Sequence, residues 1–273
     1  MLVNGQACNA VSIEDRGLLY GDGVFETILC ESGNPILFDL HMKRLQLGCE
    51  RLNLTQQSKD GLLNEVQQVA QQENGVVKII ITRGIRNRGY SYSEQDDTFT
   101  RIVSFHSLPS IPIENYQQGI RMRLCDYRLP KNKSLAGIKH LNRLDQIMAR
   151  NEWQSEYQEG LMLNNDSCVV EGTMTNVFVQ SGKEWLTPKL IDSGVSGVMR
   201  QWILDNSEQV GMQCAEAELT LQDINNAQAL FVCNSVIGIW PVVGFADKKY
   251  ATSESVFNLM KMINSQLSAL YQI

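Results

Sequence analysis

Hydrophobic and polar positions alternate with two different periods along this chain. Apolar residues at helical spacing predict helices over residues 39–54, 57–73, 142–154, 198–210 and 254–270, and Asp39 is the expected N-cap of the first helix. Short β-branched or apolar runs predict strands over residues 76–82, 101–105, 119–126, 160–163, 168–171, 175–180 and 228–234. Because the βαβ alternation is not regular, the pattern is typical of an α+β or mixed α/β protein.

Two polar or proline-containing segments interrupt this pattern and indicate how the chain is organised. Residues 84–98 join two predicted strands and form a long exposed loop, a kind of segment that is often functional. Prolines within residues 108–117 predict a crossing between domains. We therefore expect a smaller N-terminal α/β domain, residues 1–110, a linker, residues 111–117, and a larger C-terminal domain, residues 118–273.

Charge and composition narrow the classes of partner. The net charge of −6 comes from 24 basic and 30 acidic side chains without a basic stripe, so we expect no nucleic-acid partner. The N-terminus lacks the pattern of a signal peptide and no apolar run is long enough to span a membrane, which predicts a cytoplasmic location. Seven scattered cysteines without a C-x-x-C pair and only three histidines favour reduced thiols and no metal site.

Lys139 is the first residue that could carry chemistry. It follows small residues, which let the backbone approach a ligand closely, and it precedes a predicted helix. A lysine amine acts as a nucleophile when desolvation or nearby cations lower its pKa, and Lys131, Lys133 and Arg143 are close in sequence. On these residues alone, a solvated loop lysine is the simpler interpretation, since most lysines are exposed.

Glu171 closes a short apolar strand, where a carboxylate can point into a site and hold a cation such as a protonated pyridine nitrogen. A turn glutamate in water is the alternative. Gly194 and Gly197 flank Ser196 directly before a predicted helix, whose free N–H groups and positive dipole end favour an anion, although an ordinary N-cap would also fit.

Two further positions could contact a ligand. His41 and Arg44 share a helix face, where the arginine could bind a phosphate in a bidentate way or simply belong to a basic surface. Asn234 and Ser235 end an apolar strand, where their side chains could reach a ligand or merely start a turn.

Taken in order, these segments resemble the landmarks of the fold-type IV pyridoxal-phosphate enzymes. The segments span nearly the whole chain and comprise residues 15–27, 41–45, 135–143, 171–178, 194–200 and 233–235. The family includes branched-chain and D-amino-acid aminotransferases and aminodeoxychorismate lyases. Residues 88–91 and 136–144, which read Arg-Gly-Tyr-Ser and Ala-Gly-Ile-Lys-His-Leu-Asn-Arg-Leu, are more similar to the lyase members.

The resemblance implies a two-domain, D-amino-acid-aminotransferase-like architecture, a pyridoxal 5′-phosphate cofactor and a homodimer. It implies that Lys139 forms the Schiff base with the cofactor and that Glu171 pairs with the pyridine nitrogen. The residues that it implies near the phosphate are Arg44, Val195, Ser196, Gly197, Asn234 and Ser235.

The lyase reaction would convert 4-amino-4-deoxychorismate, a small-molecule substrate, to 4-aminobenzoate and pyruvate on the route to folate, with Lys139 as the base. Because this substrate carries two carboxylates, basic or polar side chains should bind it, and the candidates are Arg88, Tyr90, Arg101 and Asn142. An aminotransferase of branched-chain or D-amino acids is the nearest alternative. A non-catalytic protein on the same scaffold would predict that the lysine is absent, whereas Lys139 stands in its full context.

Overall fold

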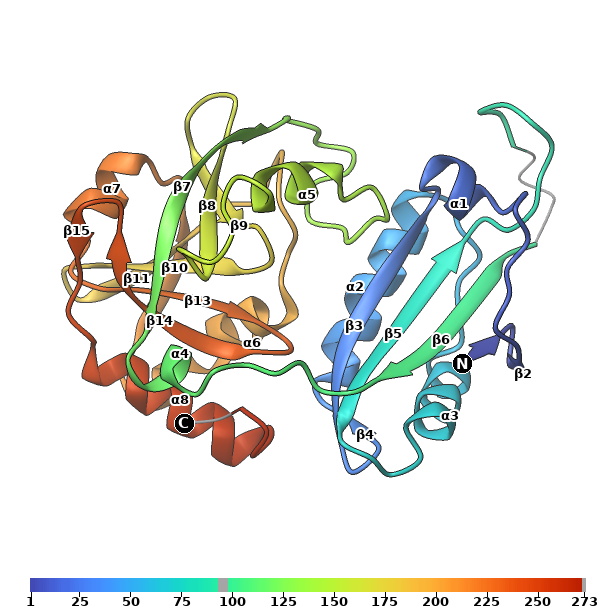
Figure 1. Ribbon diagram of the computed structural model, residues 1–273, viewed down its shortest axis with the longest axis horizontal. Helices are drawn as coiled ribbons and strands as arrows, with labels where there is room; N and C mark the ends of the chain where they lie inside the picture. Colours follow the sequence, from blue (N-terminus) through green and yellow to red (C-terminus); the bar gives the residue numbers. More distant parts are fainter. Residues whose placement is uncertain (93–97, 272–273) are drawn as a thin grey trace. The chain divides into compact units, whose positions relative to one another are not determined.

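The computed structural model describes residues 1–92 and 98–271, which form two compact units (Figure 1). The first unit comprises Met1–Pro109 and Ile138–Asn142, and the second comprises Ser110–Gly137 and Arg143–Ile273. Lys139 therefore packs with the first unit, whereas the sequence assigned it to the C-terminal domain. The expected linker, residues 111–117, belongs to the second unit and contains part of a short helix, α4 (Glu114–Gln117).

The first unit is built on an antiparallel sheet with the strand order β2-β1-β6-β5-β3-β4. The predicted strands β5 (Gly75–Thr82) and β6 (Thr100–His106) are neighbours in it. Of the predicted loop that joins them, residues 93–97 lie outside the described residues. The hydrophobic pattern did not predict β3, which pairs with β5 along its length. The remaining bounds are β1 (Leu2–Val3), β2 (Gln6–Ala7), β3 (Gly23–Glu31) and β4 (Asn34–Pro35).

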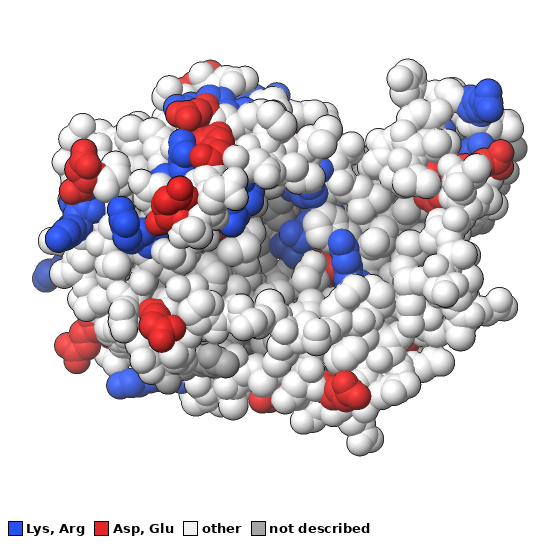
Figure 2. All heavy atoms as spheres, in the orientation of Figure 1, with Lys and Arg blue, Asp and Glu red and all other residues white. Residues whose placement is uncertain are grey.

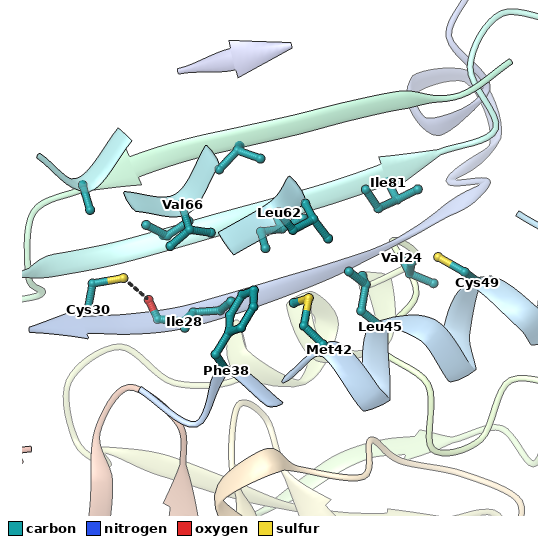
Figure 3. Close-up of a cluster of buried hydrophobic side chains, with 14 of the residues drawn as sticks. Val24, Ile28, Cys30, Phe38, Met42, Leu45, Cys49, Leu62, Val66 and Ile81 are labelled. Atoms are coloured by element: carbon teal, nitrogen blue, oxygen red, sulfur yellow. Dashed lines mark hydrogen bonds between the residues drawn. The ribbon is translucent and has the colours of Figure 1, made fainter. Parts of the chain in front are cut away.

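Helices α2 (Phe38–Arg51) and α3 (Lys59–Ala70) share a core with this sheet, and a short helix, α1 (Arg16–Tyr20), precedes β3 (Figure 3). The prediction that Asp39 caps α2 is wrong. The helix begins one residue earlier, after Leu37 in a left-handed conformation, and Asp39 lies in its first turn, 2.8 Å from the Lys59 ammonium. The acidic side chain still suits this end of the helix dipole.

The second unit holds a mixed sheet with the order β12-β11-β10-β13-β14-β7-β8-β9, and β15 pairs with β14. The pairs β11–β12, β14–β7 and β7–β8 are parallel. The strands are β7 (Ile120–Leu129), β8 (Glu159–Asn164), β9 (Val169–Gly172), β10 (Asn176–Ser181), β11 (Glu184–Pro188), β12 (Gln213–Ala217), β13 (Leu230–Asn234), β14 (Gly238–Phe245) and β15 (Lys248–Lys249).

Aromatic and aliphatic side chains fill the second unit. The Phe178 and Phe231 rings stack with centroids 4.7 Å apart, and Trp185 lies 5.1 Å from Phe231. Such ring contacts stabilise a core beyond simple burial. The helical elements are α5 (Leu144–Arg150), α6 (Val198–Asn206), the 3₁₀ turn η1 (Ser207–Val210), α7 (Leu221–Asn226) and α8 (Glu254–Gln266).

An antiparallel sheet with helices in the first unit and a mixed sheet with helices in the second confirm the α+β, mixed α/β class. Within the described residues, the helices are too short or too polar to cross a membrane. Basic and acidic side chains are interspersed on the face drawn in Figure 2, which shows no basic stripe running across it.

Candidate functional site

The segment that carries Lys139 lies along the edge of β3 in the first unit. The Phe25 N–H donates to the Lys139 carbonyl at 2.9 Å, and the Leu141 N–H donates to the Gly23 carbonyl at 2.9 Å. The Lys139 ammonium lies 4.5 Å from the centroid of the Phe25 ring, and the residue is half-buried. Lys139 is therefore held by strand-like pairing beside an aromatic face and is not a freely solvated loop lysine.

A buried acid, Glu26, follows Phe25 on β3 and binds both polar residues that the sequence placed on one helix face. His41 Nδ1 is 2.6 Å from Glu26 Oε2, and both side chains are inaccessible to solvent. Arg44 Nε donates to Glu26 Oε1 at 2.8 Å and Nη2 donates to Oε2 at 2.5 Å. Sequence reasoning missed Glu26, and the structure gives Arg44 this carboxylate partner, so its contact with phosphate stays a prediction.

The electrostatics of this cluster follow from burial and from the two residues that bind the acid, Arg44 and His41. Burial raises the pKa of Glu26, but the Arg44 charge and hydrogen bonds, together with His41, lower it to about 2. Burial lowers the pKa of His41 and outweighs the opposing effect of Glu26, while Arg44 and Lys139 lower it further. A neutral imidazole that donates its Nδ1–H to an ionised Glu26 satisfies both shifts.

The depressed pKa of Glu26 predicts a specific loss of stability in acid. The group stabilises the fold fully above its unfolded value of 4.5, and the stabilisation disappears as the pH falls toward about 2. The contribution is on the order of 3 kcal/mol. The free energy of unfolding should therefore differ between the wild type and Glu26→Gln at neutral pH, and this difference should shrink below about pH 4.5. Chemical denaturation across this range measures it, and a constant difference would contradict the assignment.

In the second unit, the glycine-rich segment before α6 is fixed by three neighbours. The Val195 N–H donates to Glu171 Oε2 at 2.8 Å, and Asn176 Nδ2 donates to the Val195 carbonyl at 3.0 Å. The Ser196 N–H donates to the Gly137 carbonyl at 3.0 Å. Gly197 is the N-cap of α6 and makes no side-chain capping bond. The loop before α6 is thus held by these contacts, and the first N–H groups of the helix itself are suited to an anion.

Two glycines are required by this packing. A Cβ atom on Gly197 would lie 1.8 Å from Asn176 Oδ1, and one on Gly137 would lie 3.0 Å from Ser196 Oγ. Gly137 also adopts a φ of +82°, which other residues rarely tolerate. Gly137 is the last residue of the second unit before the segment Ile138–Asn142, which carries Lys139 and belongs to the first unit.

Glu171 lies on β9 and is only 4% exposed, so it is not a turn glutamate in water. Besides the Val195 N–H, its carboxylate has Gln146 Nε2 at 3.5 Å from Oε1. Burial lowers the pKa of Arg143, and the Glu171 charge opposes this effect, so the guanidinium lies within the field of the carboxylate. Glu171 is a buried carboxylate suited to a cationic partner.

The turn after Glu171 is organised by a second buried acid, Glu159, which the sequence did not reveal. Its Oε1 accepts from the Gly160 N–H at 2.8 Å and from the Thr173 N–H and hydroxyl at 3.0 and 2.5 Å. Its Oε2 accepts from the Met174 N–H at 3.2 Å and the Thr175 hydroxyl at 2.9 Å. These bonds fix residues 172–175 between Glu171 and Asn176.

Comparison with known proteins shows which family has this arrangement. The model of the family described as amino-transferase class IV matches residues 23–245. This chain belongs to the class IV aminotransferase family. Class IV proteins are pyridoxal-phosphate-dependent enzymes, which confirms the cofactor and the enzyme class that the sequence predicted.

Class IV relatives of known structure or activity match nearly the whole chain. The aminodeoxychorismate lyase of Vibrio harveyi is 31% identical over 268 residues, which cover 97% of this chain and 98% of that protein. The crystal structure of 4-amino-4-deoxychorismate lyase from Pseudomonas aeruginosa superimposes with a TM-score of 0.91 at 35% identity, covering 97% and 98% of the two chains. The D-alanine aminotransferase of Bacillus licheniformis is 27% identical, with 85% and 82% covered. The fold-type IV architecture is thereby confirmed.

The class IV resemblance also named Asn234 and Ser235 as phosphate contacts. Asn234 Oδ1 accepts from the Val236 and Ile237 N–H groups at 2.8 and 2.9 Å, and its Nδ2 donates to the Met174 carbonyl at 3.1 Å. The side chain therefore shapes the turn between β13 and β14. Its contact with phosphate, like that of Ser235, stays a prediction.

The four substrate-binding candidates all lie in the first unit, but they do not form one group. Arg88 and Tyr90 are exposed in residues 84–92, and the Tyr90 ring meets the Tyr20 ring edge-on at 5.7 Å. Asn142 donates to the Gly21 carbonyl at 3.1 Å. Arg101 lies on β6, where its guanidinium donates to the Glu65 carboxylate and the Gln57 amide oxygen.

Cysteines and metal-binding groups add nothing to the site. The cysteines of the described residues are free thiols, and burial raises the pKa of several, including Cys30 and Cys49, to about 12. No cluster of three or more potential metal ligands occurs in the described part of the chain.

Proposed function

We propose that this protein is a pyridoxal-phosphate-dependent lyase that converts 4-amino-4-deoxychorismate to 4-aminobenzoate and pyruvate. The observation that carries the proposal is the end-to-end similarity to lyases from two bacteria, at 31% and 35% identity, in a chain that keeps Lys139 beside Phe25. A homodimer, a cytoplasmic location and the absence of a nucleic-acid partner belong to the same proposal.

The residues present suit the cofactor. Lys139, half-buried beside the Phe25 ring, would hold it covalently through the nitrogen of its deprotonated side-chain amine. Val195, Ser196 and Gly197, together with the positive end of the α6 dipole, would form the site for its phosphate. Glu171, which is buried and ionisable, would hold a proton on its pyridine nitrogen. The side chains of Arg44, Asn234 and Ser235 complete the proposed set.

When bound, the cofactor would supply an electron sink for the carbon that carries the substrate amine. Lys139 would take the proton from that carbon and return a proton to the departing enolpyruvyl oxygen. Glu171 would keep the pyridine nitrogen protonated, which makes the cofactor ring a better electron acceptor. Arg88, Tyr90 and Asn142 are the proposed contacts of the substrate carboxylates, whereas the guanidinium of Arg101 is already bound by Glu65 and Gln57. Because loss of the enolpyruvyl oxygen makes the substrate ring aromatic, aromatisation would help to drive the elimination.

An aminotransferase is the second candidate, and the 27% identity to a D-alanine aminotransferase favours it. It would use Lys139 and Glu171 in the same way but require an amino acceptor.

One assay separates the two functions. The purified, cofactor-loaded protein is mixed with 4-amino-4-deoxychorismate in the absence of any keto acid. We expect 4-aminobenzoate and pyruvate in equal amounts. Failure to form 4-aminobenzoate, together with amino transfer from D-alanine or leucine to 2-oxoglutarate, would reject the lyase and support the aminotransferase.

A further inference from the structure

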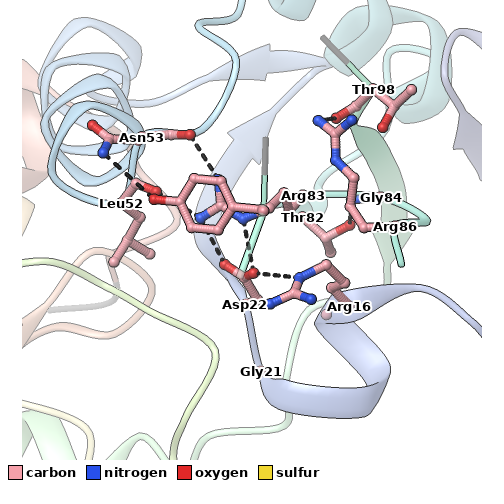
Figure 4. A network of polar contacts seen from close by, with 12 residues as sticks. Arg16, Gly21, Asp22, Leu52, Asn53, Thr82, Arg83, Gly84, Arg86 and Thr98 are labelled. Carbon is pink, nitrogen blue, oxygen red and sulfur yellow. Dashed lines mark hydrogen bonds and ion pairs between the residues drawn. The ribbon is translucent and has the colours of Figure 1, made fainter. Parts of the chain in front are cut away.

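A buried carboxylate, Asp22, joins two arginines in the first unit (Figure 4). Arg16 Nε donates to Asp22 Oδ2 at 2.9 Å. Arg83 Nε donates to the same oxygen at 2.8 Å, and its Nη2 donates to Oδ1 at 3.0 Å. The side chains are 5%, 6% and 15% exposed for Arg16, Arg83 and Asp22, so this is a largely desolvated three-charge cluster.

Both arginines extend from the carboxylate to the segment after β5. Arg16 Nη1 donates to the Gly89 carbonyl at 2.7 Å. The Arg83 guanidinium lies 3.6 Å from the centroid of the Tyr92 ring, a distance that indicates stacking. Arg83 also donates to the Leu52 and Asn53 carbonyls at 2.7 and 2.8 Å, which anchors it to the end of α2. Residues 84–92 are therefore fixed at Gly89 and at Tyr92, on either side of Tyr90.

The backbone around Asp22 holds the lysine segment. The Gly23 carbonyl accepts from the Leu141 N–H, and the Gly21 carbonyl accepts from Asn142 Nδ2 at 3.1 Å. Gly21 has a φ of +66°, and a Cβ atom there would lie 2.4 Å from Asn142 Oδ1, so the contact requires glycine. The backbone neighbours of Asp22, Gly21 and Gly23, thus bind the lysine segment. Its side-chain partners, Arg16 and Arg83, contact residues 84–92.

The charge balance of the cluster depends on Asp22. Burial raises the pKa of the carboxyl, but the hydrogen bonds and charges of Arg83 and Arg16 outweigh burial and hold the pKa below its ordinary value. Without the carboxylate, two buried guanidinium groups would face each other unneutralised, and one or both would move out to solvent. The residues that they hold, Gly89 and Tyr92, would then lose their anchors.

We propose that Asp22 is a positioning residue that, through Arg16 and Arg83, fixes residues 84–92 and with them the substrate-carboxylate candidates Arg88 and Tyr90. This inference rests on the proposed function, in which the substrate is a dicarboxylate. Asp22 itself contacts neither substrate nor cofactor. Its loss should therefore weaken substrate binding and leave cofactor binding in place.

The test compares Asp22→Asn and Arg16→Gln in the loaded enzyme. Arg16→Gln removes the Gly89 anchor while the Asp22–Arg83 pair remains, so it stays informative if Asp22→Asn folds poorly. Lys59→Gln, which removes an exposed cation of the same unit, is the matched control. Each variant is measured for KM, kcat and cofactor affinity, and for the rate of tryptic cleavage after Arg86 or Arg88, mapped by mass spectrometry.

We expect KM to rise about 10-fold or more in both variants, as for the loss of a charge-assisted hydrogen bond, with kcat and cofactor affinity changed less than about 2-fold. Tryptic cleavage within residues 84–92 should accelerate, and the control should match the wild type. Unchanged cleavage, or an unchanged KM with accelerated cleavage, would overturn the proposal. If the wild type does not turn over 4-amino-4-deoxychorismate, the proposed function fails, and the cleavage rates alone still decide whether Asp22 anchors the segment.

Discussion

Turnover should fall by on the order of 10⁴-fold or more when Lys139 is replaced by alanine, because one amine is proposed both to hold the cofactor and to move the proton. The backbone carbonyl of residue 139 still accepts from the Phe25 N–H in the variant, so the segment should keep its place along β3. The amine and its packing on the Phe25 ring are lost, whereas the backbone contacts of the segment remain. The defect should therefore be chemical and not a failure to fold.

Borohydride reduction followed by peptide mass spectrometry measures the covalent bond directly. The wild type should carry the cofactor on the peptide that contains Lys139, and the variant should carry none, while thermal melting of both proteins stays similar. Lys133→Ala, at an exposed lysine six residues earlier, is the control and should behave as the wild type does. Label on another lysine, or substantial turnover by Lys139→Ala, would contradict the assignment.

Long amphipathic segments were predictable because their pattern and their burial agree. In α2, the apolar residues Met42, Leu45 and Cys49 recur at helical spacing, and each is at most 2% exposed. In α5 the same kind of pattern identified a shared face, yet Leu144, Ile147 and Met148 are 72%, 52% and 58% exposed. Periodicity states which residues lie together on a helix, but what covers them depends on distant segments.

Two of the longer strands that the pattern missed, β3 and β14, contain residues that argue locally against a strand. β3 carries Glu26 in its middle, and a buried acid is compatible with a strand only because His41 and Arg44 reach it from α2. β14 contains Pro241 and begins at Gly238, residues that normally argue against a strand. In both cases tertiary contacts outweigh the local preference of the chain.

The residues of the candidate site also fall into those that the sequence could reveal and those that it could not. Lys139, Glu171 and the segment from Gly194 to Gly197 could be proposed from short motifs, because their neighbours in sequence carry the signal. Asp22 and Glu159 could not, because their partners lie up to 61 and up to 16 residues away in the chain and become visible only in three dimensions. Arg101 is the opposite case. Its sequence neighbours left it as a candidate for substrate binding, but in the fold its guanidinium is bound by Glu65.

Glu171→Gln is expected to lower kcat by on the order of 10²–10³-fold, the size of effect that follows removal of one preorganised electrostatic contact. The amide oxygen of glutamine can still accept from the Val195 N–H, so the loop before α6 should keep its shape. What disappears is the negative charge that would keep the pyridine nitrogen protonated. The loss should therefore appear in kcat, with cofactor affinity and KM changed only a few-fold.

Single-turnover release of 4-aminobenzoate by the loaded wild type and variant measures this effect without interference from product release. Glu184→Gln, at an exposed acid of the same unit, is the control for loss of one carboxylate and should be silent, because exposed substitutions usually cost within about 0.5 kcal/mol. Thermal melting and cofactor titration establish that the variant is folded and loaded. An unchanged single-turnover rate in such a protein would remove Glu171 from the chemistry and reduce it to a structural acceptor for the Val195 N–H, leaving Lys139 as the residue on which the reaction depends.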